Sequence, residues 1–109
     1  MLDEELVFFV QLHLKPERIE DWKRAVGELI DRMSQEDAFV TCLLDQSAED
    51  STVFTLYERW REPSLKAFIR NQMKEYRKAY EELLPALLQT PRKTMLLRPI
   101  RQWRRSLPA

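Results

Sequence analysis

Four segments of the chain alternate like β-strands but carry apolar residues in both phases of the alternation. In residues 6–14, Phe8 and Val10 occupy one phase, and Val7 and Phe9 occupy the other. Successive side chains of a strand point to opposite faces, so a sheet built from such segments has two apolar faces. A sheet with one face in water would alternate more cleanly between apolar and polar residues. The chain must therefore cover its sheet on both sides.

Two stripes at helical spacing lie between these segments. The first helix is expected to open at Pro16, because proline is favoured in a first turn. The second is expected to run from about Ser64, a good N-cap, towards Leu84, where Pro85 ends it. The first stripe consists of Ile19, Trp22, Val26, Leu29, Ile30 and Met33, and the second of Leu65, Phe68, Ile69, Gln72, Met73, Tyr76, Tyr80, Leu83 and Leu84.

The order of the elements is therefore βαββαβ. We expect the strands at about residues 6–14, 38–45, 52–60 and 93–98. This order predicts an α+β, ferredoxin-like fold, a four-stranded antiparallel sheet with two helices on one face. With 109 residues the chain has room for one domain, residues 1–100, followed by a basic C-terminal tail, residues 101–109.

The face of the sheet turned away from the helices needs a cover of its own. Four strands about 4.8 Å apart and about 20 Å long give a face of about 380 Å², a size at which exposed apolar surface calls for an explanation. The simplest cover is the same face of a second copy, so the sequence predicts a homodimer. The residues expected on this open face are Val7, Phe9, Phe39, Leu43, Val53, Tyr57, Met95 and Leu97.

Composition narrows the class of protein. The 44% hydrophobic and 33% charged residues are typical of a globular protein. No apolar run approaches the roughly 20 residues of a membrane span, so no membrane partner is expected. The acidic N-terminus is unlike a signal peptide, so we expect a cytoplasmic protein. Cys42 is the single cysteine and has no disulfide partner. The single glycine, Gly27, argues against glycine-rich phosphate-binding loops.

Charge gives no support for nucleic-acid binding. Residues 1–50 hold 13 acids and 5 bases, and residues 51–109 hold 5 acids and 13 bases, so the net charge is zero. An RNA-recognition domain shares the βαββαβ order, but the basic-Gly-aromatic-Gly strand of that class is absent. No nucleic-acid partner is expected.

Four short motifs stand out along the chain: Leu14-Lys15-Pro16-Glu17, Leu56-Tyr57-Glu58-Arg59-Trp60, Leu65-Lys66-Ala67-Phe68 and Met73-Lys74-x-Tyr76. With these motifs the chain resembles the antibiotic biosynthesis monooxygenase family of dimeric α+β barrels, which includes the quinol monooxygenases. The likeness covers Glu5 to Ile100. The resemblance implies oxidation of a small aromatic or quinol-type molecule by O₂ without metal, flavin or other cofactor.

The chain departs from the quinol-type pattern at the helix after Trp60. Those enzymes commonly carry a histidine after the Leu-x-Ala and a second about five residues on, whereas this chain has Phe68 at the first position and Gln72 near the second. Phenylalanine cannot shuttle protons near neutral pH as histidine can. The haem-degrading branch needs a histidine ligand on this helix, and residues 64–89 contain none.

The candidate site lies between the third strand and the second helix. Glu58 and Tyr76 are the candidate catalytic residues, with His13 as the alternative, and Phe54, Trp60, Phe68, Gln72 and Met73 are the candidate substrate-binding residues. Three of these also have a structural interpretation: Trp60 as core, Glu58 as the partner of an arginine or the cap of a backbone group, and Tyr76, like Tyr80, as amphipathic packing. Phe54, Phe68 and Met73 form the apolar lining under either interpretation. His13, the single histidine, has no ligand partner at metal spacing, so no metal site is predicted.

Two functions follow from these residues. The first is a cofactor-independent monooxygenase that binds a small aromatic molecule between sheet and helices. The second is a non-catalytic dimeric barrel that binds a small hydrophobic ligand or serves as an interaction module. Trp103 and the tail arginines Arg98, Arg101, Arg104 and Arg105 are interpreted as a solvated tail that docks on the partner subunit.

Overall fold

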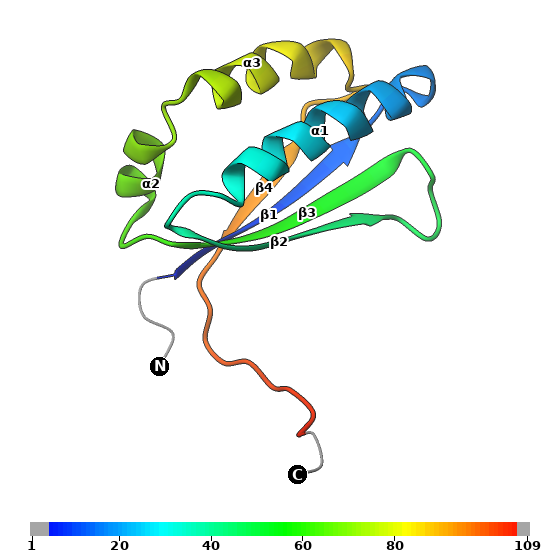
Figure 1. Ribbon diagram of the computed structural model, residues 1–109. Helices are drawn as coiled ribbons and strands as arrows, with labels where there is room; N and C mark the ends of the chain where they lie inside the picture. The colour runs from blue at the N-terminus through cyan, green and yellow to red at the C-terminus, as the bar shows by residue number, and fades with distance from the viewer. Residues whose placement is uncertain (1–4, 107–109) are drawn as a thin grey trace.

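The computed structural model describes residues 5–106 of the chain (Figure 1). Residues 1–4 of the predicted domain and residues 107–109 of the predicted tail lie outside the described residues. The strands are β1 (Glu5–His13), β2 (Phe39–Gln46), β3 (Val53–Arg61) and β4 (Lys93–Leu97). They form one antiparallel sheet of order β2-β3-β1-β4. The predicted ferredoxin-like α+β fold is confirmed.

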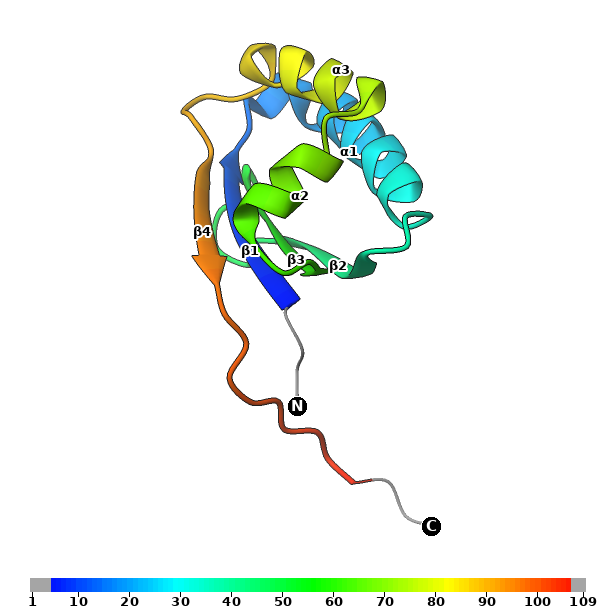
Figure 2. The same cartoon turned by 90° about the vertical axis from the view of Figure 1, so that its left-hand side faces the viewer.

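The helices all lie on one face of this sheet (Figures 1 and 2). A short 3-10 helix, η1 (Pro16–Arg18), leads into α1 (Ile19–Met33), which buries the predicted stripe through Trp22, Val26, Leu29 and Met33. Trp22, predicted on the first helical stripe, and Trp60, whose structural interpretation is a core residue, are both 0% exposed.

The second predicted helix is two helices, α2 (Leu65–Asn71) and α3 (Glu75–Leu83), followed by the 3-10 helix η2 (Leu84–Ala86). Ser64 caps α2 as predicted, since its Oγ accepts a hydrogen bond from the Ala67 N–H at 3.1 Å. The break falls at residues 72–74, where Lys74 has an extended backbone. Because the chain turns there, α2 lies across one end of the sheet and α3 runs beside α1 (Figure 2).

Phe39 is on the opposite face from the one predicted. It pairs with Trp60 in the sheet, and its ring lies edge-on to that indole at 5.3 Å on the helix side. The register of β2 against β3 shifts between Phe39 and Thr41, which marks a β-bulge. A bulge inserts one extra residue, so the alternation read back from Leu43 assigns Phe39 to the wrong face.

The open face of the sheet carries the other apolar residues predicted for it. Phe9 lies opposite Tyr57 on one side and Met95 on the other, and Leu43 continues the row beyond Tyr57. Leu43 is 54% exposed and Met95 59%. At the end of this face Val7 is buried opposite Arg59, whose Nη2 pairs with Glu5 Oε1 at 2.7 Å.

Candidate functional site

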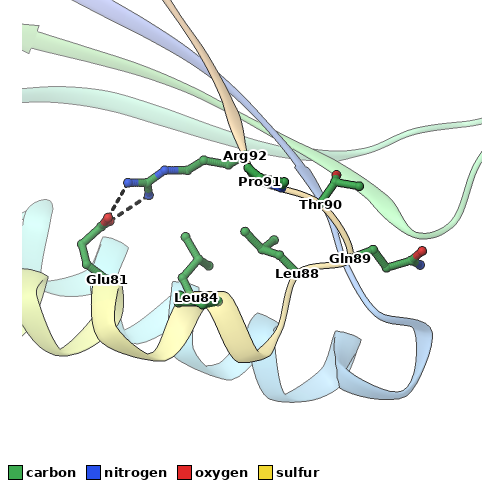
Figure 3. Close-up of a pocket in the computed structure, with 8 residues that line it drawn as sticks. Glu81, Leu84, Leu88, Gln89, Thr90, Pro91 and Arg92 are labelled. Atoms are coloured by element: carbon green, nitrogen blue, oxygen red, sulfur yellow. Dashed lines mark hydrogen bonds and ion pairs between the residues drawn. The ribbon is translucent and has the colours of Figure 1, made fainter.

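Two adjoining pockets lie where the helices meet the β4 side of the sheet. The first, of about 480 Å³, lies between the end of α3 and the segment that leads into β4 (Figure 3). The second, of about 600 Å³, lies along the α2–α3 junction. Glu81 and Arg92 line both. Arg92 Nη1 donates to Glu81 Oε2 at 2.8 Å, so this ion pair forms the wall between the pockets.

The second pocket, which we call the junction pocket, combines apolar and cationic walls. Its apolar residues are Phe68, Ile69 and Met73, and Met73 is 82% exposed. Its charged residues are Lys74, Glu75, Arg77, Lys78, Glu81 and Arg92, and Gln72 completes the lining. An apolar wall beside a few polar groups is typical of a small-molecule site.

Arg77 is held in this wall by its neighbours but is not fully satisfied. Its Nε donates to Gln72 Oε1 at 2.9 Å, and its guanidinium lies 5.7 Å from the centre of the Phe68 ring. Its Nη2 is enclosed and has no hydrogen-bond partner. Among the side-chain nitrogen and oxygen atoms of residues 5–106, it is the one buried atom without such a partner. Buried donors are nearly always paired, so this exception calls for an explanation.

Glu58 is a buried acid on the helix side of β3. It is 8% exposed, and its Oε1 accepts a hydrogen bond from the Trp60 indole N–H at 3.1 Å. Burial raises the pKa of this carboxyl. The Trp60 hydrogen bond and the charges of Arg77 and Arg92 lower it by a smaller amount, so the pKa stays above its ordinary value. Glu58 is therefore within electrostatic reach of two arginines that line the junction pocket.

The predicted substrate-binding residues divide into two groups. Phe68, Gln72 and Met73 meet at the junction pocket. Trp60 and Phe54 lie in the core, where the Trp60 ring contacts Phe68 at 5.1 Å. Phe54 is farther along β3, with its ring 5.0 Å from that of Trp22.

Tyr76 lies away from the junction pocket. It lines a separate pocket of about 470 Å³ between α1 and α3, and its hydroxyl donates to the Glu36 carboxylate. Glu36 also accepts from Gln72 Nε2 at 2.8 Å and from Lys74 Nζ at 2.7 Å. These contacts join the end of α1 to the α2–α3 junction.

His13 is half-buried in a third region. It lines a pocket of about 220 Å³ with Gln11, Val53, Thr90, Pro91 and Lys93. His13 follows Val7, Phe9 and Gln11 in the phase of β1 that faces away from the helices. The part of the chain that the structure describes contains no group of three or more histidine, cysteine or acidic side chains able to hold a metal ion.

The sequence pattern did not indicate Arg77 or Arg92, whereas Tyr80 belongs to the predicted helical stripe. In an unbroken helix Arg77 would lie about 140° around the axis from Gln72, on a different face; the break at residues 72–74 brings both to one pocket. Arg92 lies in the irregular segment before β4, where no periodicity applies. The Tyr80 hydroxyl accepts from the Trp22 indole N–H at 3.0 Å, and burial raises its pKa to about 12.

Cys42 lies beside Glu58 in the sheet. Burial, together with the negative charge of Glu58, raises the pKa of its thiol to about 12. A thiol with such a pKa stays protonated near neutral pH and is a poor nucleophile, in keeping with the structural role of a small hydrophobe.

Comparison with known proteins identifies the family. Among solved structures, a protein from Pseudomonas aeruginosa is 24% identical with a TM-score of 0.78, over 93% of this chain and 99% of that one. One from Mycobacterium tuberculosis is 19% identical with a TM-score of 0.80, over 90% and 97%. A third, an antibiotic biosynthesis monooxygenase, is 22% identical with a TM-score of 0.77, over 88% and 99%. No curated protein sequence matches the chain.

These structural likenesses establish the shared fold. The sequence profile of the antibiotic biosynthesis monooxygenase family matches residues 6–82, from β1 to α3, which is most of the chain and includes both Glu58 and Arg77. The chain therefore belongs to the antibiotic biosynthesis monooxygenase family.

Proposed function

We propose that this protein is a cofactor-independent monooxygenase that acts on a small aromatic or quinol-type molecule bound between the sheet and the helices. The observation that carries the proposal is Glu58, a buried acid of raised pKa whose charge is felt by Arg77 and Arg92, two residues that line the partly apolar junction pocket. A base whose pKa is raised towards the working pH is better matched to proton transfer from a phenolic hydroxyl.

The proposed reaction needs little from the protein beyond binding and proton handling. A hydroquinone and O₂ give a hydroxyquinone and water, with one oxygen atom entering the ring and the other leaving as water. The substrate supplies the electrons after Glu58 takes a hydroxyl proton. Arg77 and Arg92, which act on the charge of Glu58, would stabilise the phenolate.

Tyr76 is the weaker of the two candidate catalytic residues in this proposal. Its hydroxyl is bound to Glu36, and the pocket that it lines lies on the α1 side of α3. We assign it a positioning role, since it fixes the start of α3 and thereby the wall that contains Arg77.

The test is oxygen consumption by purified, metal-free protein with dihydroxy-aromatic compounds. Glu58→Gln keeps the shape of the side chain but removes the base, so turnover should fall by about 10²–10⁴-fold. Simple hydroquinones should be turned over slowly, because the helix lacks the proton-carrying histidines of the quinol-type enzymes. Rapid oxidation that survives both Glu58→Gln and Tyr76→Phe would place the site elsewhere, and His13 would be the first residue to test.

A non-catalytic, ligand-binding barrel is the second candidate. It is favoured by the positions of Phe68 and Gln72, which line the junction pocket where histidines were expected from the resemblance. In this case aromatic compounds bind but no oxygen is consumed with any of them. The protein would act as a homodimer through the open sheet face in either case.

A further inference from the structure

The unpaired nitrogen of Arg77 bears on the chemistry of the ligand. A buried donor without a partner costs the full desolvation of the group. The rest of the guanidinium is held by its neighbours: Nε is bound to Gln72, and the central carbon lies 5.7 Å from the centre of the Phe68 ring. A planar guanidinium held in this way is suited to a carboxylate or a similar planar anion.

The charges around the junction pocket also favour an anion. Of its four cations, Lys74 is bound to Glu36 and Arg92 to Glu81. Arg77 and Lys78 form no salt bridge with any residue from 5 to 106. Glu75 is the one lining acid outside these pairs, so the pocket has positive charge in excess.

The apolar part of the same pocket favours a flat ring. Phe68 is buried, whereas Ile69 and Met73 are exposed large hydrophobic residues on the pocket wall. Methionine adapts its shape to a ligand and makes favourable contacts with aromatic rings. An apolar wall with an unpaired guanidinium beside it matches a molecule that is both aromatic and acidic.

We propose that Arg77 determines the specificity of the junction pocket and that the ligand is a small aromatic carboxylic acid. Its ring lies against Phe68 and Met73, and its carboxylate is bound by Arg77 and Lys78. The carboxylate meets the side of the guanidinium that lines the pocket, while Nε stays bound to Gln72. This inference rests on the proposed function, because it names the substrate class of the same site.

The experiment is a calorimetric titration without oxygen, with 2,5-dihydroxybenzoate and its methyl ester as the two probes. The wild-type protein should bind the acid at least about tenfold more tightly, the difference expected for a charge-assisted hydrogen bond. Arg77→Gln should abolish this preference. The matched control is Arg70→Gln, an exposed arginine on α2 outside the pocket lining, which should keep it.

Equal affinity of the wild-type protein for acid and ester would overturn the proposal, as would a preference that persists in Arg77→Gln. If Arg77→Gln does not fold, Arg77→Lys serves instead and should lose most of the preference, because a lysine stem cannot reproduce the planar fork. Oxygen uptake is measured separately. If the protein prefers the acid to the ester but consumes no oxygen, the monooxygenase function is wrong and this inference stands. If the protein consumes oxygen but does not prefer the acid, this inference is wrong and the monooxygenase function stands.

Discussion

At the scale of single residues, the helix side of β3 places one polar side chain, that of Glu58, among the apolar residues of the core. Phe54, Leu56 and Trp60 are buried as the alternation predicts, and Glu58 shares their face. Burial of a carboxyl without an ion pair disfavours its charged form. The Trp60 hydrogen bond and two nearby arginines offset part of that cost, and the pKa of Glu58 remains raised.

The first prediction is that Glu58 makes the protein less stable as the pH rises. Its pKa is raised above the ordinary 4.5, so between 4.5 and the folded pKa the folded protein keeps a proton that the unfolded chain has lost. The free energy of unfolding therefore falls as pH increases through this interval. In thermal unfolding from pH 4 to 8, the melting temperature of wild type should fall relative to that of Glu58→Gln. Parallel curves would show that the carboxyl is not perturbed.

The second prediction concerns the two buried tryptophans. Trp22→Ala or Trp60→Ala should each lower the free energy of unfolding by about 3–5 kcal/mol, since both side chains are fully enclosed. Trp103→Ala, in the exposed tail, is the matched control and should change it by less than about 0.5 kcal/mol. Denaturant titration gives all three values. Losses below about 1 kcal/mol at both buried positions would contradict the packing described.

At the scale of elements, the sequence predicted each strand to within about a residue but not the break between α2 and α3. Residues 72–74 include neither glycine nor proline, and the helical stripe continues through them. The break depends on Glu36, a residue distant in the sequence that accepts hydrogen bonds from Gln72, Lys74 and Tyr76. Local periodicity cannot predict a turn that is fixed by a tertiary contact.

The same limit explains what was missed in the site. Phe68, Gln72 and Met73, which line the junction pocket, were predicted from their place on a helix stripe. The guanidinium of Arg77 reaches the pocket only because the helix breaks, and the β-bulge at Phe39 has no marker in the sequence.

The third prediction is that Glu36 fixes the α2–α3 junction. Glu36→Ala leaves the buried Gln72 amide without its acceptor and should lower the free energy of unfolding by about 1–3 kcal/mol. Amide hydrogen exchange should increase at the end of α2 and the start of α3. Asp37→Ala, at the exposed neighbouring position, should change neither quantity. Unchanged exchange in Glu36→Ala would mean that the junction is fixed by other contacts.

At the scale of the whole molecule, the uneven charge is partly neutralised within the fold. The acidic first half and the basic second half are joined by the ion pairs Arg59–Glu5 and Lys74–Glu36. Residues 101–106 extend away from the sheet and the helices (Figure 1). Trp103 is 73% exposed, and the Arg101 guanidinium lies 4.7 Å from the centre of its ring. No helix among residues 5–106 is long and apolar enough to cross a membrane.

The last prediction is that the open face of the sheet is a dimer interface. Leu43 and Met95 are more than half exposed and flank Phe9 and Tyr57, so the row is apolar across all four strands. Leu43→Glu would bury an unpaired charge at the interface and should convert a dimer to monomer or cause aggregation. Leu65→Glu, at an exposed apolar position on α2, is the control and should remain dimeric. Sedimentation equilibrium gives the mass of each, and a wild-type protein that stays monomeric at micromolar concentration would refute the interface.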